Sequence, residues 1–339
     1  MKTVVSVQEV QEYDIKPVAA LVQWRSLVEQ EIGRRWHGRP DWITVACPSC
    51  GLDQGKPAFE RMGIPYAECP ACASLYASQR PNERELWWWY RESEPARFWR
   101  EQMLPVSESS RREKITLPRS EWILDNIAEY VPDARRLVDV SANGRSLLDL
   151  LVNALPDLTE AVSAGMTADL DGRPTARIAV QPSKVADLKG LGPVDVIVAV
   201  DALDRSSDLK SLVGAFETIL TPGGVLFATV SVASGFEVQA LWERSNTISP
   251  PDKLNLPTVD GLQQIFSGPA WEILELSTPG MFDVEMVRNV MKQAPDQAWP
   301  RLLRSLVERT DAAGRMALVE FLQSRRLASF ARLIVRRRR

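Results

Sequence analysis

The pattern of apolar and polar positions is most regular between Gly192 and Val230. Residues 194–200 form an almost continuous β-branched run, which is typical of a strand buried on both faces of a parallel sheet. From Ser207 onwards the apolar residues recur at helical spacing, at Leu209, Leu212, Val213, Phe216 and Leu220. Pro222-Gly223-Gly224 ends that helix, and residues 225–230 form a second apolar strand. The stretch therefore predicts a βαβ unit with a right-handed crossover.

Less regular patterns predict the other elements. Helices are expected at 17–36, 145–155 and 258–266, with one more that ends at Pro132 and a helical region at 302–327 that breaks at Gly314. Strands are expected at 136–140, 159–164, 176–180, 271–276 and 329–335. This alternation of strands and helices is typical of an α/β protein with a doubly wound, mostly parallel sheet.

The composition indicates a globular chain with no preference for a charged partner. The 339 residues are 45% hydrophobic and 25% charged, with a formal net charge of −3. That balance gives no support to a nucleic-acid partner, and the four arginines at 336–339 are expected to form a solvated tail. Because the sequence shows neither a secretory apolar segment nor a long uncharged apolar stretch, we expect a cytoplasmic protein without a membrane span.

All four cysteines occur in two C-x-x-C pairs, Cys47/Cys50 and Cys69/Cys72, which are separated by eighteen residues. Each pair can form a tight turn whose backbone amides point at the sulfurs, and two such turns offer four thiolates in a tetrahedron, which suits Zn²⁺. Four thiolates leave no open position for water, so this zinc would be structural. Redox disulfides and an iron–sulfur cluster are the alternatives. We predict a zinc ribbon whose metal replaces much of a hydrophobic core.

An aromatic-rich segment follows the cysteines. It contains Trp87, Trp88, Trp89 and Tyr90 in one run, with Trp99 nearby. Three consecutive tryptophans cannot share one face of a helix. We expect some to pack between the ribbon and the main domain, and others to line an acceptor pocket or stack on bases. The acidic charge balance argues against base stacking, so packing is the preferred interpretation.

Several ordered phrases carry a resemblance to a known family. Tyr66, Cys69, Cys72 and Tyr76 form a Y-x-x-C-x-x-C-x-x-x-Y phrase, and the 194–230 unit contains the turn L-x-P-G-G. Longer phrases lie at 235–245, 250–255 and 277–289. From about Cys47 onwards the chain resembles class I S-adenosylmethionine (SAM)-dependent methyltransferases with an N-terminal zinc ribbon. That group occurs among sugar and surface-polysaccharide modification enzymes and includes nucleotide-sugar C-methyltransferases.

The resemblance implies a fold and a division of the chain. The main sheet should have seven strands, mostly parallel, with an antiparallel last strand. The chain would then divide into a helical lead (1–45), a four-cysteine zinc ribbon (46–80), an aromatic-rich helical linker (81–133) and a SAM-methyltransferase-like domain (134–339).

The resemblance also implies cofactor-binding residues. They are Asp139, Ser141, Ala142, Asn143 and Gly144 after the first strand of the main domain, and Asp201, Ala202 and Leu203 after the 194–200 strand. The family has D-x-G-x-G-x-G in the first loop, where glycines let the backbone approach the methionine moiety. Here Ser141 replaces the first glycine and the loop is one residue shorter. Met166 stands where an acidic residue normally holds the ribose, which leaves Asp169 or Asp171 as substitutes.

The candidate catalytic residues are Lys253, Asn255 and Arg205. Lys253 and Arg205 stand at positions where the family has histidines, which suit proton removal at neutral pH. A lysine can act as a base only if burial or a like charge lowers its pKa. Otherwise Lys253 would clamp an anionic group or simply face solvent, and the sequence leaves the three interpretations open.

We therefore expect a SAM-dependent methyltransferase that acts on a sugar, a nucleotide-sugar or a related small molecule, by direct displacement onto oxygen or carbon. The altered cofactor loop favours an alternative, a catalytically inactive scaffold or regulatory partner in a glycan-assembly complex. A ribbon that binds nucleic acid would need a basic face, which the sequence does not show.

Overall fold

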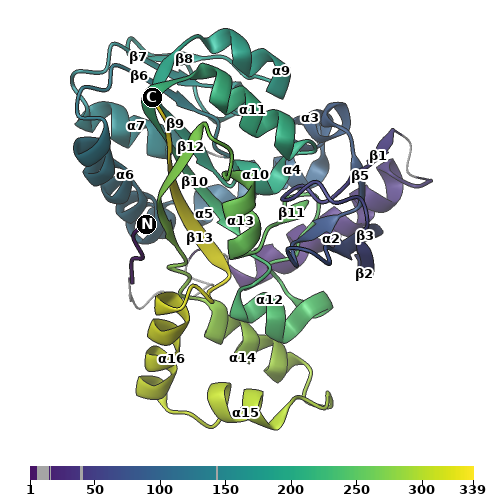
Figure 1. Ribbon diagram of the computed structural model, residues 1–339. Coiled ribbons are helices and arrows are strands. Elements are labelled where there is room, and N and C mark those ends of the chain that lie inside the picture. The colour runs from purple at the N-terminus through teal and green to yellow at the C-terminus, as the bar shows by residue number, and fades with distance from the viewer. Residues whose placement is uncertain (6–14, 16, 39–40, 143) are drawn as a thin grey trace.

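The computed structural model describes residues 1–5, 15, 17–38, 41–142 and 144–339, and a seven-stranded sheet lies at its centre (Figure 1). The strand order is β12-β13-β10-β9-β6-β7-β8. The bounds are Arg136–Asp139 (β6), Glu160–Ser163 (β7), Ile178–Val180 (β8), Val194–Val200 (β9), Leu220–Ser231 (β10), Trp271–Ser277 (β12) and Phe330–Arg337 (β13). Strands β8, β7, β6, β9 and β10 are parallel, whereas β13 is antiparallel to β10 and β12. The predicted α/β fold class is confirmed, including the antiparallel last strand.

The sheet is apolar on both faces because successive strand residues point into two different cores. On β9, Val196 and Val198 belong to one core, and Ile197 and Ala199 to the other. The first core is covered by α6 (Leu117–Tyr130) and α7 (Arg145–Ala154). The second is covered by α9 (Val185–Leu188), α11 (Leu209–Ile219) and α13 (Val259–Ile265). The result is a three-layer α/β/α arrangement (Figure 1).

The unit β9–α11–β10 forms as the sequence predicts. Asp208 caps α11 by accepting a hydrogen bond from Ser211 N at 3.0 Å. The expected turn at 222–224 lies within the bounds of β10, where the pairing with β9 is irregular between Leu220 and Val225. Gly223 has φ of 90°, a conformation that residues with a side chain rarely adopt.

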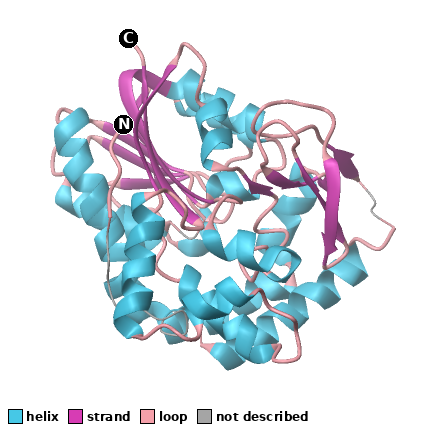
Figure 2. Cartoon of the chain, turned by 60° about the horizontal axis from the view of Figure 1, so that its bottom comes forward, coloured by secondary structure: helices cyan, strands magenta, loops and turns pink. Residues whose placement is uncertain are grey.

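The N-terminal ribbon lies beside the main sheet and has its own strands (Figure 2). One pair consists of β1 (Trp42–Thr44) and β5 (Gln79–Pro81). A four-stranded sheet has the order β11-β4-β3-β2, with bounds Asn255–Leu256 (β11), Leu75–Ala77 (β4), Ile64–Glu68 (β3) and Lys56–Arg61 (β2). Its edge strand β11 comes from the far half of the chain, so the ribbon is completed by the domain that it precedes.

Helices connect and extend these sheets. Before α6 lie α2 (Val18–Arg35), α3 (Glu83–Glu92), α4 (Glu94–Phe98), the π-helical turn η1 (Trp99–Met103), α5 (Leu104–Arg111) and the π-helical turn η2 (Arg112–Thr116). Short helices follow the strands: α8 (Ala168–Asp171), η3 (Lys189–Leu191), α10 (Ala202–Arg205), α12 (Phe236–Leu241) and η4 (Trp242–Arg244). A helical extension projects below the sheet and consists of α14 (Asp283–Gln293), α15 (Arg301–Val307) and α16 (Ala312–Ser324) (Figure 1).

The ribbon and the main domain share a hydrophobic core. Tyr66 and Leu75 of the ribbon belong to the same cluster as Leu86 of α3 and Val238 and Ile248 of the main domain. Trp36 stacks on Trp89 within it, with ring centroids 4.8 Å apart. The division of the chain into four parts stays a prediction, because this core crosses three of its boundaries.

Two other expectations meet the structure here. The helical region at 302–327 is interrupted at 308–311 rather than at Gly314, because Asp311 caps α16 by accepting from Gly314 N at 2.8 Å. Among the described residues, no helix is both long and apolar enough to cross a membrane.

Candidate functional site

A pocket opens at the carboxyl edge of the main sheet, where β6, β7, β8 and β9 end. Its empty volume is about 690 Å³ with its open mouth included. Apolar side chains form most of its wall, with contributions from the loops after all four strands and from α3; the members discussed below are Glu83, Tyr90, Ser141, Ala142, Met166 and Ala202. We call this the edge pocket. The strand order reverses between β6 and β9, which is where an open α/β sheet binds ligands.

The loop after β6 continues along β9 instead of opening outward. Val140 N donates to Val198 O at 2.8 Å, and Ala142 N donates to Val200 O at 3.0 Å. Between them, Ser141 Oγ accepts from Val200 N at 2.9 Å. The Ser141 hydroxyl thus replaces a backbone partner and holds the loop closed against the strand. Ser141 and Ala142 still line the edge pocket.

Asp139, at the end of β6, points into the protein. It is only 2% exposed, and its carboxylate accepts from Ser141 N at 2.9 Å. Burial raises the pKa of Asp139 to about 6, against the lowering effect of Ser141. Of the other residues in the predicted loop, Asn143 lies outside the described residues. These contacts assign Asp139 to shaping the loop.

Glycines make the close approaches around this loop. A Cβ on Gly144 would lie 2.3 Å from Asp139 Oδ2, and one on Gly165 would lie 2.7 Å from Ser141 O. Both distances are shorter than any real side chain allows. Gly144 therefore leaves room for the buried carboxylate, and Gly165 lets the loop after β7 pack on the loop after β6.

The end of β7 carries Met166 at the edge pocket, in the place of an acidic side chain. The suggested substitutes are engaged elsewhere. Asp169 accepts two hydrogen bonds from Arg91, at 2.6 and 2.8 Å. Asp171 accepts from Thr167 Oγ1 at 2.6 Å. Neither aspartate lines the pocket.

Glu83 is a pocket residue that the sequence analysis missed. It begins α3, directly after the Asn82 cap, which accepts from Glu85 N at 3.0 Å. Glu83 Oε1 accepts from Val185 N at 2.7 Å, across the pocket from the linker to the loop after β8. A carboxylate in the linker has no local sequence signal for this role, because 102 residues separate the two partners.

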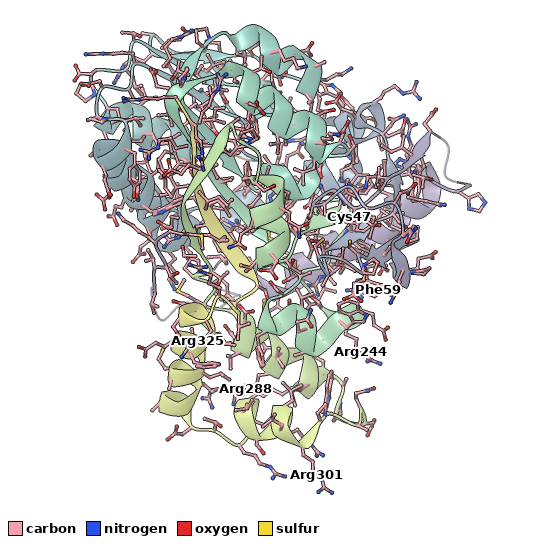
Figure 3. The ribbon with its side chains drawn as sticks, viewed as in Figure 1. Cys47, Phe59, Arg244, Arg288, Arg301 and Arg325 are labelled. Atoms are coloured by element: carbon pink, nitrogen blue, oxygen red, sulfur yellow. The ribbon has the colours of Figure 1, made fainter. Side chains whose placement is uncertain are left out.

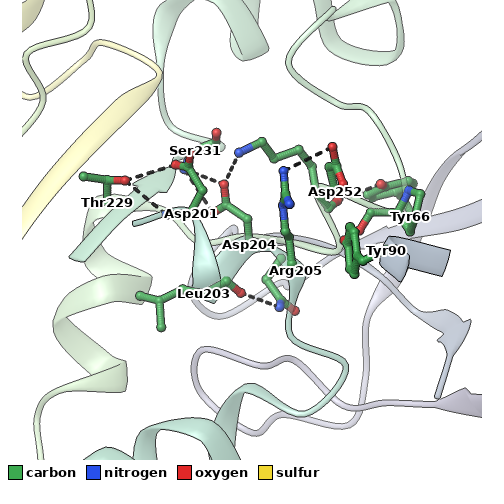
Figure 4. Close-up of polar contacts among 12 residues, drawn as sticks. Tyr66, Tyr90, Asp201, Leu203, Asp204, Arg205, Thr229, Ser231 and Asp252 are labelled. Carbon is green, nitrogen blue, oxygen red and sulfur yellow. Dashed lines mark hydrogen bonds and ion pairs between the residues drawn. The ribbon is translucent and has the colours of Figure 1, made fainter. Parts of the chain in front are cut away.

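Asp201 stands where β9 ends, and its backbone is left-handed with φ of 54°. Such a conformation costs roughly 1–3 kcal/mol in a residue with a side chain and tends to occur at functional sites. Thr229 Oγ1 donates to Asp201 Oδ1 at 3.0 Å (Figure 4). Burial opposes ionisation of Asp201, but the cations Lys253, Arg119 and Arg205 outweigh it and lower its pKa. The next two residues, Ala202 and Leu203, belong to α10. Ala202 lines the edge pocket, whereas Leu203 is buried in the core.

Lys253 forms an ion pair with Asp204, which is fully buried (Figure 4). Ser231 N also donates to Asp204, at 3.1 Å. Burial alone would lower the pKa of Lys253, but Asp204 and Asp201 outweigh it and raise that pKa. Lys253 is therefore held protonated at neutral pH. Of the three interpretations that the sequence left open, the raised pKa opposes a base and the burial opposes a solvent-facing lysine, and the ammonium is engaged by Asp204 within the protein.

Arg205 lies between the edge pocket and a second pocket. Its Nη2 is 3.4 Å from Asp252 Oδ2, and its guanidinium lies 5.0 Å from the centroid of the Tyr90 ring. Asp252 and Tyr90 outweigh the effect of burial and raise the pKa of Arg205. Its Nε is buried and donates to no partner among the described residues.

The second pocket has an aromatic wall and an empty volume of about 450 Å³. We call it the tryptophan pocket. Its wall includes Trp24, Trp89 and Trp99, and it shares Tyr90, Thr167 and Arg205 with the edge pocket. The Nε1 of Trp99 is buried and, like Arg205 Nε, lacks a partner in the described part of the chain.

Asn255 holds backbone together. Its Nδ2 donates to Leu203 O and Ser206 O, both at 2.8 Å, and its Oδ1 accepts from Arg80 Nη1 at 2.6 Å. Arg80 is fully buried and also donates to Ala77 O and Leu254 O. These bonds fasten the ribbon and β11 to α10. The Asn255 amide is thus hydrogen-bonded within the protein through both its nitrogen and its oxygen.

The four cysteine sulfurs lie within 4.8 Å of one another, and none is in a disulfide. The Sγ atoms of Cys47 and Cys72 are 3.6 Å apart, and those of Cys50 and Cys69 are 3.5 Å apart. Bonds of about 2.3 Å in a tetrahedral zinc site place sulfurs about 3.8 Å apart. The donor set and spacing therefore fit one zinc ion, with no position left for water.

The cysteine cluster is tied to the segment that carries Lys253. Thr258 Oγ1 donates to Cys72 O at 2.6 Å, and Thr258 N donates to Ser74 Oγ at 3.1 Å. Tyr66 of β3 donates its hydroxyl hydrogen to Lys253 O at 2.7 Å. Folding of the ribbon thus fixes the backbone on both sides of β11.

No protein-family model and no curated protein matches the chain. Solved structures with a similar fold include the plantazolicin methyltransferase BpumL in complex with SAH, at 10% identity and a TM-score of 0.47, over 76% of this chain and 95% of that one. A putative sarcosine dimethylglycine methyltransferase from Galdieria sulphuraria has 14% identity and a TM-score of 0.43, over 66% and 86%. Coclaurine N-methyltransferase bound to N-methylheliamine and SAH has 11% identity and a TM-score of 0.40, over 64% and 72%. At these values the likeness concerns the fold.

Proposed function

We propose that the protein is a SAM-dependent methyltransferase whose cofactor occupies the edge pocket. The observation that carries this proposal is the pocket itself, which lies at the reversal of strand order and is walled by the ends of four parallel strands. When bound, SAM supplies an electrophilic methyl group on a sulfonium.

The residues of the edge pocket fit an adenosine-bearing cofactor, though by another route than the family pattern. The mostly apolar wall suits a purine ring. Glu83 is the carboxylate at this pocket that would accept hydrogen bonds from ribose hydroxyls, in place of Met166. One Glu83 oxygen is held by Val185 N, which fixes the orientation of the other.

We place the methyl acceptor in the adjoining tryptophan pocket, which meets the edge pocket at Tyr90, Thr167 and Arg205. Aromatic rings suit the apolar faces of a sugar. The unpartnered donors on Trp99 and Arg205 suit its oxygen atoms. A sugar or nucleotide-sugar is therefore the acceptor that we propose. Lys253, whose ammonium is paired with Asp204 and held protonated, would not remove a proton from the acceptor.

The test is transfer of a labelled methyl group from SAM to a panel of sugars, sugar phosphates and nucleotide-sugars. The proposal expects label in at least one acceptor and a loss of more than tenfold in Glu83→Ala. The matched control is Glu92→Ala, which changes another glutamate of α3 that is absent from the pocket wall. If the protein binds SAM but transfers label to no acceptor of the panel, the proposed methyl transfer is contradicted.

A second candidate function is a non-catalytic scaffold or regulatory partner in glycan assembly. It is favoured by the closed loop at Ser141 and by the absence of an acidic residue at Met166. Under this hypothesis the purified protein binds neither SAM nor its product, and it co-purifies with a partner protein instead.

We further propose that Cys47, Cys50, Cys69 and Cys72 hold one structural zinc ion. The spacing of the four sulfurs supports this proposal. Metal analysis checks it, and well under one zinc per chain would contradict it.

A further inference from the structure

Three arginines converge near the carboxyl end of β10, beside the proposed acceptor site. They come from three elements: Arg111 ends α5, Arg119 lies in α6 and Arg332 lies in β13. In the sheet, Arg332 pairs directly with Thr229, the residue that hydrogen-bonds Asp201.

Each guanidinium is held by an aromatic ring instead of a carboxylate. Arg111 lies 5.3 Å from the centroid of Trp99, Arg119 lies 5.9 Å from Phe330, and Arg332 lies 5.0 Å from Trp122. Within the described ranges, none of the three arginines is within ion-pair distance of an acidic side chain. An arginine held by its face keeps its N–H edge available for a planar or tetrahedral oxyanion.

Several of these N–H groups are unsatisfied. Arg111 Nε donates to Ser107 Oγ at 3.0 Å, but Arg111 Nη2 is buried without a partner in the described part of the protein. The same holds for Arg332 Nε. Buried guanidinium donors without acceptors are rare in native proteins, and a missing anion is a physical explanation for them.

The charges around the three arginines do not balance. Burial lowers the pKa of Arg111, Arg119 and Arg332, and Arg119 repels each of the other two. The facing carboxylates are Asp201 and Glu275. Asp201 is shared with Lys253 and Arg205, and Glu275 accepts from Trp122 Nε1 and Ser277 Oγ. The cluster therefore carries uncompensated positive charge.

The π-helical turn η2 explains how two of the arginines come to the same side. Arg111 and Arg119 are eight residues apart, which would set them about 80° apart around a regular α-helix. A π-turn holds one extra residue, which reduces the offset to about 20°. Such turns are frequent at functional sites.

We propose that Arg111, Arg119 and Arg332 form an oxyanion site for a phosphate or carboxylate group of the methyl acceptor. The site lies next to Asp201, whose neighbour Ala202 lines the edge pocket. The proposed acceptor is therefore narrowed to one that carries a phosphate or carboxylate group, and this assignment rests on the proposed function.

Inorganic phosphate is the probe, and the thermal midpoint of the whole zinc-loaded protein is the readout, at an ionic strength matched with sodium chloride. Phosphate is expected to raise the midpoint of the wild type by several degrees. In Arg119→Gln the phosphate effect should vanish. Arg332→Gln is a second variant that should also lose the phosphate effect.

Arg301→Gln is the matched control, because Arg301 is exposed at the far end of the helical extension (Figure 3). It should keep the phosphate effect unchanged. No phosphate effect in the wild type, or an equal effect in all variants, would overturn the oxyanion site.

The cofactor's own carboxylate is the other source of an oxyanion. The affinity for SAH, compared between the wild type and Arg119→Gln, separates the two sources, with 5′-methylthioadenosine as the ligand that lacks a carboxylate. Equal SAH affinity supports the acceptor. If Arg119→Gln binds SAH tenfold more weakly than the wild type but binds 5′-methylthioadenosine equally well, the assignment to the acceptor is overturned. Failure of SAH to bind the wild type, with the phosphate effect intact, would reject the proposed function but keep the oxyanion site.

Discussion

At the scale of single residues, burial of charged groups sets the chemistry of the sheet edge. Asp139, Asp204 and Glu237 are all buried, and burial raises their pKa values to about 6, 6 and 7. Each of these acids binds its proton more tightly in the folded than in the unfolded state. Their contribution to stability is therefore complete below the unfolded pKa and is lost as pH rises through the folded pKa.

Asp139→Asn tests this linkage at the proposed cofactor loop. The folded pKa is about 6 and the unfolded value is 3.8. Ionisation of Asp139 should therefore lower the free energy of unfolding by about 2.5 kcal/mol between pH 4 and pH 7.5. The variant should lose that part of the pH dependence and gain stability at pH 7.5. Urea unfolding at both pH values measures the free energy of unfolding. A pH dependence identical to that of the wild type would show that folding does not raise the pKa of Asp139.

Lys253→Met tests the ion pair with Asp204. Removing the cation leaves a buried carboxylate unpaired, which typically costs about 3–5 kcal/mol. The loss should be large at pH 8 and smaller at pH 5, where Asp204 can take up a proton. The double variant Lys253→Met/Asp204→Asn should recover much of it. An unchanged stability at pH 8 would mean that Lys253 faces solvent.

At the scale of elements, the ribbon and the acceptor half are built together. Strand β11 joins the ribbon sheet, and Arg80 donates to Ser206 O directly after α10 and to Leu254 O directly before β11. On the other side of β11, Thr258 donates from Oγ1 to the backbone carbonyl of Cys72, next to the cysteine cluster. The ribbon thereby fixes the position of Lys253 and of the turn that carries Arg205.

Arg80→Met should destabilise the protein strongly. It removes a donor from Asn255 Oδ1 and from three backbone carbonyls, of which Ser206 O and Leu254 O keep a second donor, and we expect this to cost about 3–5 kcal/mol. Arg84→Met is the control, since the Arg84 side chain is exposed and its closest ion pair, with Asp41, is exposed too, so its loss should cost less than about 1 kcal/mol. Equal effects in denaturant unfolding would refute the role of Arg80.

Removal of the metal should have an effect beyond the ribbon. Chelation is expected to lower the melting temperature and to expose the backbone amide of Thr258 to hydrogen exchange, because that amide donates to Ser74 Oγ in the ribbon. Amides of β7 serve as the internal control. Unchanged exchange at Thr258 in metal-free protein would show that the two regions are not coupled.

At the scale of the whole molecule, the sequence predicted those elements that depend on residues close together along the chain. Strand β9 was predicted residue for residue, because an uninterrupted β-branched run has few other solutions. The cysteine cluster followed from two short pairs. By contrast, β11, the Glu83 contact and the arginine cluster depend on partners about 100 residues or more away along the chain, for which a single sequence contains no signal.

The central claim is that the edge pocket binds the cofactor, and calorimetric titration of the zinc-loaded protein with SAH tests it most directly. Ala202→Phe is the matched variant, because Ala202 lines the pocket and a phenyl ring at this position would occupy space inside it. We predict micromolar binding by the wild type and at least a tenfold loss in the variant. Absence of binding at millimolar SAH, from folded wild-type protein, would contradict the claim and favour the scaffold hypothesis.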